Sequence, residues 1–255
     1  MRSVLVTVMA AGLAGSASAQ VVDLRVSVEN LAPQNSVAFA PLRVGFNNGT
    51  YDSFDNGSAA SAAIVSIAEG GSGSDWFPAF MAADPTATLG TVVPNPAGPL
   101  LPGGTAFAVF SVDPQVNPFF TFGSMVVPSN DHFIGNDDPQ QYRLFDSNGA
   151  LQINSISQFG SSVWDAGSEV TDPMNAAFLA VGMNSGRTPE NGVVNFNFTE
   201  LDAYNGLQTG AGYTFDRQFG ASDEIYRITF TVVPSPAGLA ALGASGLVGL
   251  RRRRA

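Results

Sequence analysis

The sequence predicts an all-β fold, an antiparallel β-sandwich that carries one or two short helices. Apolar segments rich in β-branched and aromatic residues recur between clusters of Gly, Asn, Asp and Pro, which is the pattern of short strands joined by turns. With 28 Gly and 16 Pro, turn-forming residues are frequent, and 19 Phe supply most of the bulky apolar volume for a core. About 215 residues lie between the two chain ends, a size that fits one all-β domain.

Seven segments have the composition of strands, and two have that of helices. The expected strands cover residues 22–28, 38–46, 105–112, 119–127, 141–145, 192–198 and 224–233. The first helix is expected over residues 58–69, where Ser58 is placed to cap the start and Gly70 follows the end. A second short helix is expected over residues 75–82, and the Pro/Gly-rich segment 94–104 is expected to be a surface loop.

The first residues have the features of a secretory signal peptide. Arg2 precedes an apolar run over residues 4–13, and small residues ending in Ala17-Ser18-Ala19 come directly before Gln20. This order of charge, apolar run and A-x-A site predicts a signal peptide over residues 1–19 that signal peptidase removes. The folded domain is therefore expected to span residues 20–233, in a protein that is exported.

The other end, residues 234–255, has a Pro234-Ser235-Pro236 motif, an uncharged small-residue segment and then Arg251 to Arg254. The apolar part is shorter than the roughly 20 residues of a stable membrane span. The segment resembles the bacterial PEP-CTERM sorting tail, with Ser235 where that family usually has Glu. The resemblance implies processing by an exosortase-type enzyme and delivery to the cell envelope, surface or exopolysaccharide layer. A short permanent membrane anchor is the alternative to transient membrane contact.

The composition of the domain between these ends excludes several function classes. There is no cysteine, so disulfide bonds and thiolate metal sites are excluded. There is also no lysine, and only 6 of the 11 basic residues lie outside the ends, against 21 acidic residues, which gives the domain a net charge of about −15. So few cations disfavour nucleic-acid binding, because they cannot neutralise phosphates. The excess of carboxylates suits divalent cations instead.

Two separated motifs carry a second resemblance. The stretch from Ser124 to Gly135, with Asn130-Asp131-His132 inside it, is followed downstream by Val163-Trp164-Asp165-Ala166-Gly167-Ser168-Glu169. Together they resemble the spondin amino-terminal domain of F-spondin and of many bacterial secreted proteins, over roughly residues 21–169. The resemblance implies an eight-stranded antiparallel β-sandwich, similar to calcium- and lipid-binding domains of synaptotagmin type. It also implies a calcium ion at one end, held by Asp131, Asp165 and Glu169, with Glu169 where the family usually has Asp.

Apart from the family resemblance, the chemistry of these residues is itself compatible with calcium binding. Calcium takes about six to eight oxygen ligands, and loops at the end of a sandwich offer carboxylates and free carbonyls together. Gly167 permits a sharp turn between Asp165 and Glu169. If no cation lay between them, their mutual repulsion would raise their pKa values, and a bound divalent ion removes that cost. The alternative is that Asp131, Asp165 and Glu169 are solvated loop carboxylates.

His132 is the only histidine. We expect it to be a loop or packing residue, because one imidazole is too few nitrogen ligands for a zinc site. The Gly-x-Ser-x-Gly elbow of a hydrolase is also absent from the sequence.

The sequence therefore favours a secreted, noncatalytic, calcium-binding module of the surface or matrix, for adhesion or exopolysaccharide association. Exopolysaccharide or surface proteins are the expected partners. The competing function is a secreted polysaccharide hydrolase in which Asp131 and Asp165 act as acid and base, which requires carboxyl groups about 5–10 Å apart across a cleft. A third alternative is a structural envelope protein without a ligand.

Overall fold

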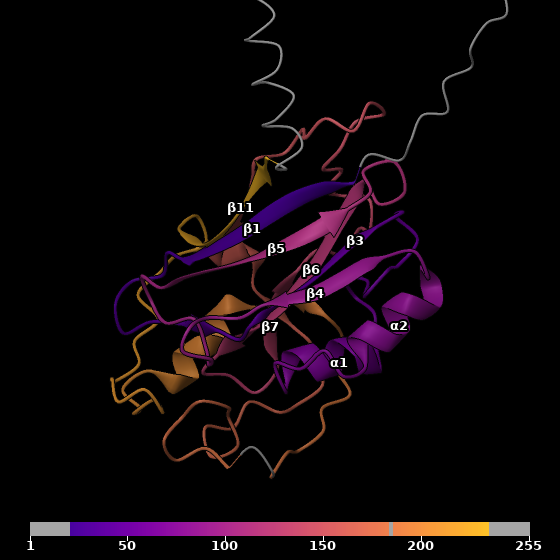
Figure 1. Ribbon diagram of the computed structural model, residues 1–255. Helices are drawn as coiled ribbons and strands as arrows, with labels where there is room; N and C mark the ends of the chain where they lie inside the picture. Colours follow the sequence, from indigo (N-terminus) through magenta and orange to yellow (C-terminus); the bar gives the residue numbers. More distant parts are fainter. Residues whose placement is uncertain (1–20, 184–185, 235–255) are drawn as a thin grey trace, which may run out of the picture.

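The computed structural model describes residues 21–183 and 186–234 (Figure 1). The predicted signal peptide and all of the predicted sorting tail after Pro234 lie outside these residues. The strands are β1 (Val22–Asn30), β2 (Ala38–Phe39), β3 (Leu42–Asn47), β4 (Thr88–Val92), β5 (Thr105–Val112), β6 (Phe119–Val127), β7 (His132–Gly135), β8 (Ser155–Phe159), β9 (Trp164–Asp165), β10 (Asn195–Phe196) and β11 (Glu224–Val233). The helices are α1 (Ala62–Ala68) and α2 (Trp76–Ala83), with short 3-10 helices η1 (Gly160–Ser162) and η2 (Phe198–Tyr204).

The strands form two antiparallel sheets, which confirms the predicted all-β sandwich. The four-stranded sheet has the order β5-β1-β11-β8. The seven-stranded sheet has the order β10-β9-β7-β6-β3-β4, with β2 paired to β6. The described residues thus hold eleven strand segments rather than eight, and β2, β9 and β10 are only two residues long.

The core between the sheets follows from alternation along the strands. In β1 the side chains of Leu24, Val26 and Val28 are buried, as expected for a strand with one face on a core. They belong to one cluster with Phe120 of β6 and Phe230 of β11, whose ring centroids lie 4.9 Å apart at an interplanar angle of 81°. Such edge-to-face pairs of large rings contribute beyond their burial and fix how the two sheets pack.

A second cluster lies on the other face of the seven-stranded sheet, where α1 and α2 cover it (Figure 1). All nine residues of β6 are buried, because the sheet has a core on both faces. The cluster joins Ile67 of α1 and Phe80 of α2 to Trp164 of β9. Gly45 in β3 permits this packing, since a Cβ at that position would lie 2.5 Å from the Phe80 ring. Trp164 faces the helices, so its neighbour Asp165 faces the opposite side of the sheet.

Several predicted elements are confirmed. Strands β5, β6 and β11 have the predicted bounds, and β1 extends past residue 28 to Asn30. Helix α2 matches the second predicted helix within one residue, and residues 94–104 contain no strand or helix.

Other predictions need correction. The strand expected over 38–46 is two strands, because Pro41 has no N–H to donate and interrupts the ladder between β2 and β3. Residues 141–145 make only isolated bridges at Arg143 and Phe145. The strand expected over 192–198 shrinks to β10. Helix α1 begins later than predicted, at Ala62 rather than Ser58, because Ser61 is the cap and its side chain accepts from the backbone N–H of Ile64.

In the part of the chain that the structure describes, no helix has the length and apolar character needed to cross a membrane.

Candidate functional site

The turn after β6 and the first residue of β7 bring together three consecutive buried polar residues, Asn130, Asp131 and His132, each at most 1% exposed. Burying such groups is unfavourable unless they are hydrogen-bonded, so each needs partners inside the protein. One hydrogen bond lies within the turn, where the backbone N–H of His132 donates to the Ser129 hydroxyl at 3.1 Å. The three side chains then contact the loop after β9, η2 and the Asn197 carbonyl that precedes η2.

Asn130 connects the turn to η2 and to the loop after β9. Its Oδ1 accepts hydrogen bonds from the Tyr204 hydroxyl at 2.7 Å and from the backbone N–H of Asp172 at 3.0 Å. Its Nδ2 donates to Oε1 of Glu169 at 2.8 Å. One buried amide thereby fixes the position of Glu169 relative to η2.

The side chain of Asp131 holds the same loop by accepting hydrogen bonds from the backbone of that loop. Oδ2 of Asp131 accepts from the backbone N–H groups of Ser168 and Glu169, at 2.7 and 3.0 Å, and from the Ser168 hydroxyl at 3.1 Å. Burial raises the pKa of Asp131 above its ordinary value, and the neighbouring charge of Asp165 raises it further. Asp131 is therefore a structural anchor of the loop, placed beside a second carboxylate.

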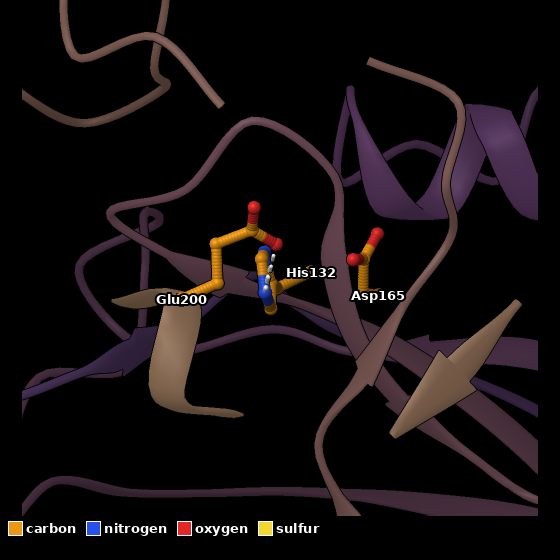
Figure 2. Close-up of side chains that lie close together, drawn as sticks. All are labelled: His132, Asp165 and Glu200. Carbon is orange, nitrogen blue, oxygen red and sulfur yellow. Dashed lines mark ion pairs between the residues drawn. The ribbon is translucent and has the colours of Figure 1, made fainter. Parts of the chain in front are cut away.

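His132 and Asp165 meet because they are direct partners in the β7–β9 register. Opposite residues of antiparallel strands have Cβ atoms about 4.5–5.5 Å apart, on the same face of the sheet. Figure 2 shows Glu200, from η2, approaching the same point from the other side of the imidazole. Potential ligand atoms of His132, Asp165 and Glu200 all lie within 4.8 Å of one another, and this is the one such group of three found in the described residues. We call it the His132–Asp165–Glu200 cluster.

Asn197 completes this cluster. Its carbonyl oxygen lies 2.9 Å from Nε2 of His132, and its side-chain Nδ2 donates to Oε2 of Glu200 at 3.0 Å and to Oδ2 of Asp165 at 3.4 Å. Oδ1 of Asp165 accepts from the backbone N–H of Gly167 at 2.7 Å. One neutral amide therefore lies between two carboxylates. Burial raises the pKa of Glu200, and its nearness to Asp165 adds to the rise.

The imidazole has one satisfied nitrogen and one that is not. Nε2 of His132 lies 3.7 Å from Oε2 of Glu200, but its closer contact is the Asn197 carbonyl, to which a protonated Nε2 donates. In the neutral ring Nδ1 is then an acceptor, and this buried atom has no hydrogen-bond partner. Two neighbouring carboxylates beside a buried imidazole form an arrangement that a cation would stabilise.

The structure places the three predicted calcium ligands near one another but not in one group of ligand atoms. Asp165 lies in the His132–Asp165–Glu200 cluster, and Asp131 lies next to it with Oδ2 bound to backbone N–H groups. Glu169 instead lines a cavity of about 410 Å³ together with Glu69 and Arg187. There Oε2 of Glu169 is 3.9 Å from Nε of Arg187, which also pairs with Glu69. In the described residues, ligand atoms of Asp131, Asp165 and Glu169 do not form one group of that size. The ligand set implied by the resemblance stays a prediction.

Sequence reasoning missed Glu200 and the contact of His132. Glu200 comes 35 residues after Asp165 in the sequence, so no local spacing connects the two. One signal was available in Asn197-Phe198-Thr199-Glu200, which has the Asn-x-x-Glu pattern of a helix start. Asn197 is indeed the cap residue of η2, although its side chain binds Glu200 and Asp165 instead of the helix backbone.

We expect the buried carboxylates in and around the cluster to make stability depend on pH in a cation-dependent way. Burial raises the pKa values of Asp131, Glu169 and Glu200. In cation-free protein, their contribution to the free energy of unfolding is complete below about pH 4 and is lost as pH rises through the raised values. Calcium favours the ionised forms, so the increase in stability that it gives should grow from pH 5 to pH 7. Urea unfolding with and without calcium at both pH values checks this. An equal calcium-induced increase in the free energy of unfolding at pH 5 and pH 7 would contradict it.

Arg217 is expected to stabilise the segment that carries Glu200. Its Nε and Nη2 donate to the two carboxylate oxygens of Asp202 in η2, at 2.7 and 3.0 Å, and its guanidinium lies 5.0 Å from the Phe198 ring centroid. The replacement Arg217→Gln should lower the free energy of unfolding by about 1 kcal/mol, because a half-exposed ion pair and a cation–π contact are each small. Arg25→Gln, which removes a cation–π contact with Phe107 far along the chain from η2, is the matched control. If both variants have the same calcium affinity, Arg217 has no role in placing Glu200.

A comparison with models of known protein families gives no match to this chain, and a comparison with curated protein sequences gives no significant match.

Proposed function

We propose that this chain is an exported, noncatalytic module of the cell surface or matrix that binds calcium and serves in adhesion or exopolysaccharide association. The observation that carries the proposal is the His132–Asp165–Glu200 cluster, in which two carboxylates lie within 4.8 Å of each other and of an imidazole nitrogen in the described structure. The export part rests on the signal peptide and sorting tail that the sequence predicts for the two ends.

Calcium is the cation that the donor set favours. Asp165 and Glu200 offer carboxylate oxygens, and the Asn197 side chain can turn its amide oxygen toward them, which suits a hard cation with oxygen ligands. His132 supplies a single imidazole, and its Nε2 is engaged with the Asn197 carbonyl. Transition-metal sites of the zinc type use more nitrogen or sulfur ligands than this. In the proposal, His132 orients Asn197 while the two carboxylates hold the ion.

The surroundings of Asp131 favour a binding role over hydrolysis. A glycosidase needs both its carboxyl groups to face the sugar. Asp131 is 1% exposed, and its Oδ2 accepts three hydrogen bonds from Ser168 and Glu169. Such a carboxylate holds a loop in place and is not accessible to a glycan. Asp165, at 7% exposure, is likewise enclosed, whereas the Glu200 side chain is 30% exposed and provides the approach for a small ion.

The proposal is tested by sedimentation of the purified protein with envelope polysaccharide from cells that produce it. We expect the protein to sediment in calcium and to be released by a calcium chelator, and Asp165→Asn to sediment weakly under both conditions. Sedimentation that ignores the chelator would contradict the role of calcium. Release of reducing sugar by the wild type but not by Asp131→Asn would replace the proposal with the hydrolase.

A further inference from the structure

A second cavity lies beside β9 and β10. Its volume is about 410 Å³, within the range of about 300–1,000 Å³ of small-molecule sites. Trp164 of β9 and Phe196 of β10 line it. Trp164 directly precedes Asp165 in its strand, so the two side chains point to opposite faces of the sheet. The lining of this cavity includes none of His132, Asp165 and Glu200, and we call it the Trp164–Phe196 pocket.

The aromatic side of the pocket is rigid and open. The rings of Trp164 and Phe196 are stacked, with centroids 3.6 Å apart and an interplanar angle of 24°. Trp164 is fixed from behind, because its Nε1 donates to the Gly135 carbonyl at 3.2 Å and the Phe54 ring packs edge-on against it at 5.1 Å. Phe196 on top of it is 52% exposed. A flat, fixed and exposed ring offers an apolar face for the C–H groups of a sugar.

The remaining lining is polar and suited to hydroxyl groups. It includes the carboxylates of Asp137 and Asp138 and the amides of Gln141 and Gln158. Amides can both donate to and accept from hydroxyls, and carboxylates accept from them. Gln158 is 4% exposed and is fixed by its own hydrogen bond to the Ser157 carbonyl at 3.1 Å, so part of this polar wall is preformed.

The charge of the pocket narrows the choice of ligand. Asp137 and Asp138 are neighbours, and after burial it is the charges of Asp55 and Asp138 that raise the pKa of Asp137. The residues that line the pocket in the described part of the chain include these two carboxylates and no Arg or Lys. Such a site repels an anionic polysaccharide and accepts hydrogen bonds from an uncharged one.

We propose that the Trp164–Phe196 pocket binds an uncharged saccharide, with Phe196 as the stacking surface and Asp137 and Gln141 as the hydroxyl-binding groups. This inference rests on the proposed function, for which it names the ligand class and the contact site. In the cation cluster Asn197 donates to Asp165, and these two residues are the direct neighbours of Phe196 and Trp164 in the chain. The cluster therefore fixes the backbone that presents the two rings.

The test is titration of the full-length protein, in calcium, with cellohexaose, laminarihexaose and mannohexaose as uncharged probes and hexagalacturonate as the anionic one. Binding is followed by calorimetry and by fluorescence, to which Trp164 and the fully buried Trp76 are the only tryptophan contributors. We expect saturable binding of at least one uncharged probe with a change in emission. Hexagalacturonate is expected not to bind.

Phe196→Ala should weaken that binding about tenfold, a loss of about 1.4 kcal/mol that matches removal of a ring contact. Phe107→Ala is the matched control, because Phe107 is a comparably exposed Phe, at 56%, that lies on β5 outside the pocket. It should bind like the wild type. Gln141→Ala is a second variant that tests the polar wall without removing a packed ring, and it should weaken binding as well.

Failure of the inference and failure of the proposed function give different results. Absence of binding by all three uncharged probes, or equal binding by wild type and Phe196→Ala, overturns the saccharide pocket. Tighter binding of hexagalacturonate than of the uncharged probes overturns it too. Calcium uptake is measured on the same samples and should be unchanged in Phe196→Ala. If uptake is absent while saccharide still binds at Phe196, the calcium part of the proposed function is wrong and the pocket stands.

Discussion

Calcium is expected to raise the midpoint of thermal unfolding, and Asp165→Asn is expected to abolish that rise. A ligand at about 100 times its dissociation constant adds roughly 2.7 kcal/mol to stability. For a domain of this size that corresponds to a shift of about 5–10 °C. Asp165 is the residue to change because it contributes to the cluster with His132 and Glu200 and also adds to the raised pKa of Asp131.

The variant has two opposing effects that the experiment separates. Without calcium, Asp165→Asn removes a negative charge next to Asp131 and Glu200, so the cation-free variant should unfold at the same temperature as the wild type or higher. When calcium is added, only the unfolding midpoint of the wild type should rise. Asp75→Asn is the matched control, because Asp75 precedes α2, is exposed and makes no side-chain capping bond. Equal calcium-induced shifts in wild type and Asp165→Asn would contradict the site.

The second large effect is expected at Asp131, where the two simplest replacements should differ. Asp131→Ala leaves the backbone N–H groups of Ser168 and Glu169 without their acceptor, which costs about 1–3 kcal/mol for each buried group. We expect a loss of about 3 kcal/mol in the free energy of unfolding, measured by urea titration. Asp131→Asn keeps an oxygen acceptor and removes a charge whose pKa burial raises, so its cation-free stability should lie within about 1 kcal/mol of the wild type.

The same pair of variants separates a loop anchor from a ligand. If Asp131 is only the anchor of the loop after β9, Asp131→Asn keeps most of the calcium-induced rise in the unfolding midpoint. If Asp131 is itself a ligand, as the spondin resemblance implies, the rise disappears in Asp131→Asn as it does in Asp165→Asn. Glu169→Gln answers the corresponding question for Glu169, whose side chain lies toward Glu69 and Arg187. Wild-type stability of Asp131→Ala would contradict the anchor role.

The parts of the fold that sequence predicted are those with a long local pattern. β1, β5, β6 and β11 contain eight to ten residues each, and apolar alternation or a continuous apolar run identifies them. β9 and β10 contain two residues each, too few for any periodicity, and they exist because β7 offers an edge on which β9 pairs. Residues 141–145 show the reverse case, since apolar composition is present but no neighbouring strand pairs with them beyond isolated bridges.

The sequence predicted the general location of the candidate site but not which side chains meet there. The motif around Asp131 and the motif around Asp165 were recognised as one site, and the structure does place them together through the β7–β9 pairing. Which of their side chains face one another depends on register, and that register sets His132, not Asp131, opposite Asp165. Glu200 reaches the site because Tyr204 of the same helix binds Asn130. Such a contact between distant segments has no signal in either segment alone.

The central claim, that Asp165 and Glu200 hold a calcium ion beside His132, is tested most directly by equilibrium dialysis with radioactive calcium. The measurement compares the wild type with the double variant Asp165→Asn/Glu200→Gln, which keeps the size of both side chains and removes both charges. We predict that the wild type binds an ion that the double variant loses. Equal calcium uptake by the two proteins, or no uptake by the wild type at millimolar calcium, would contradict the claim.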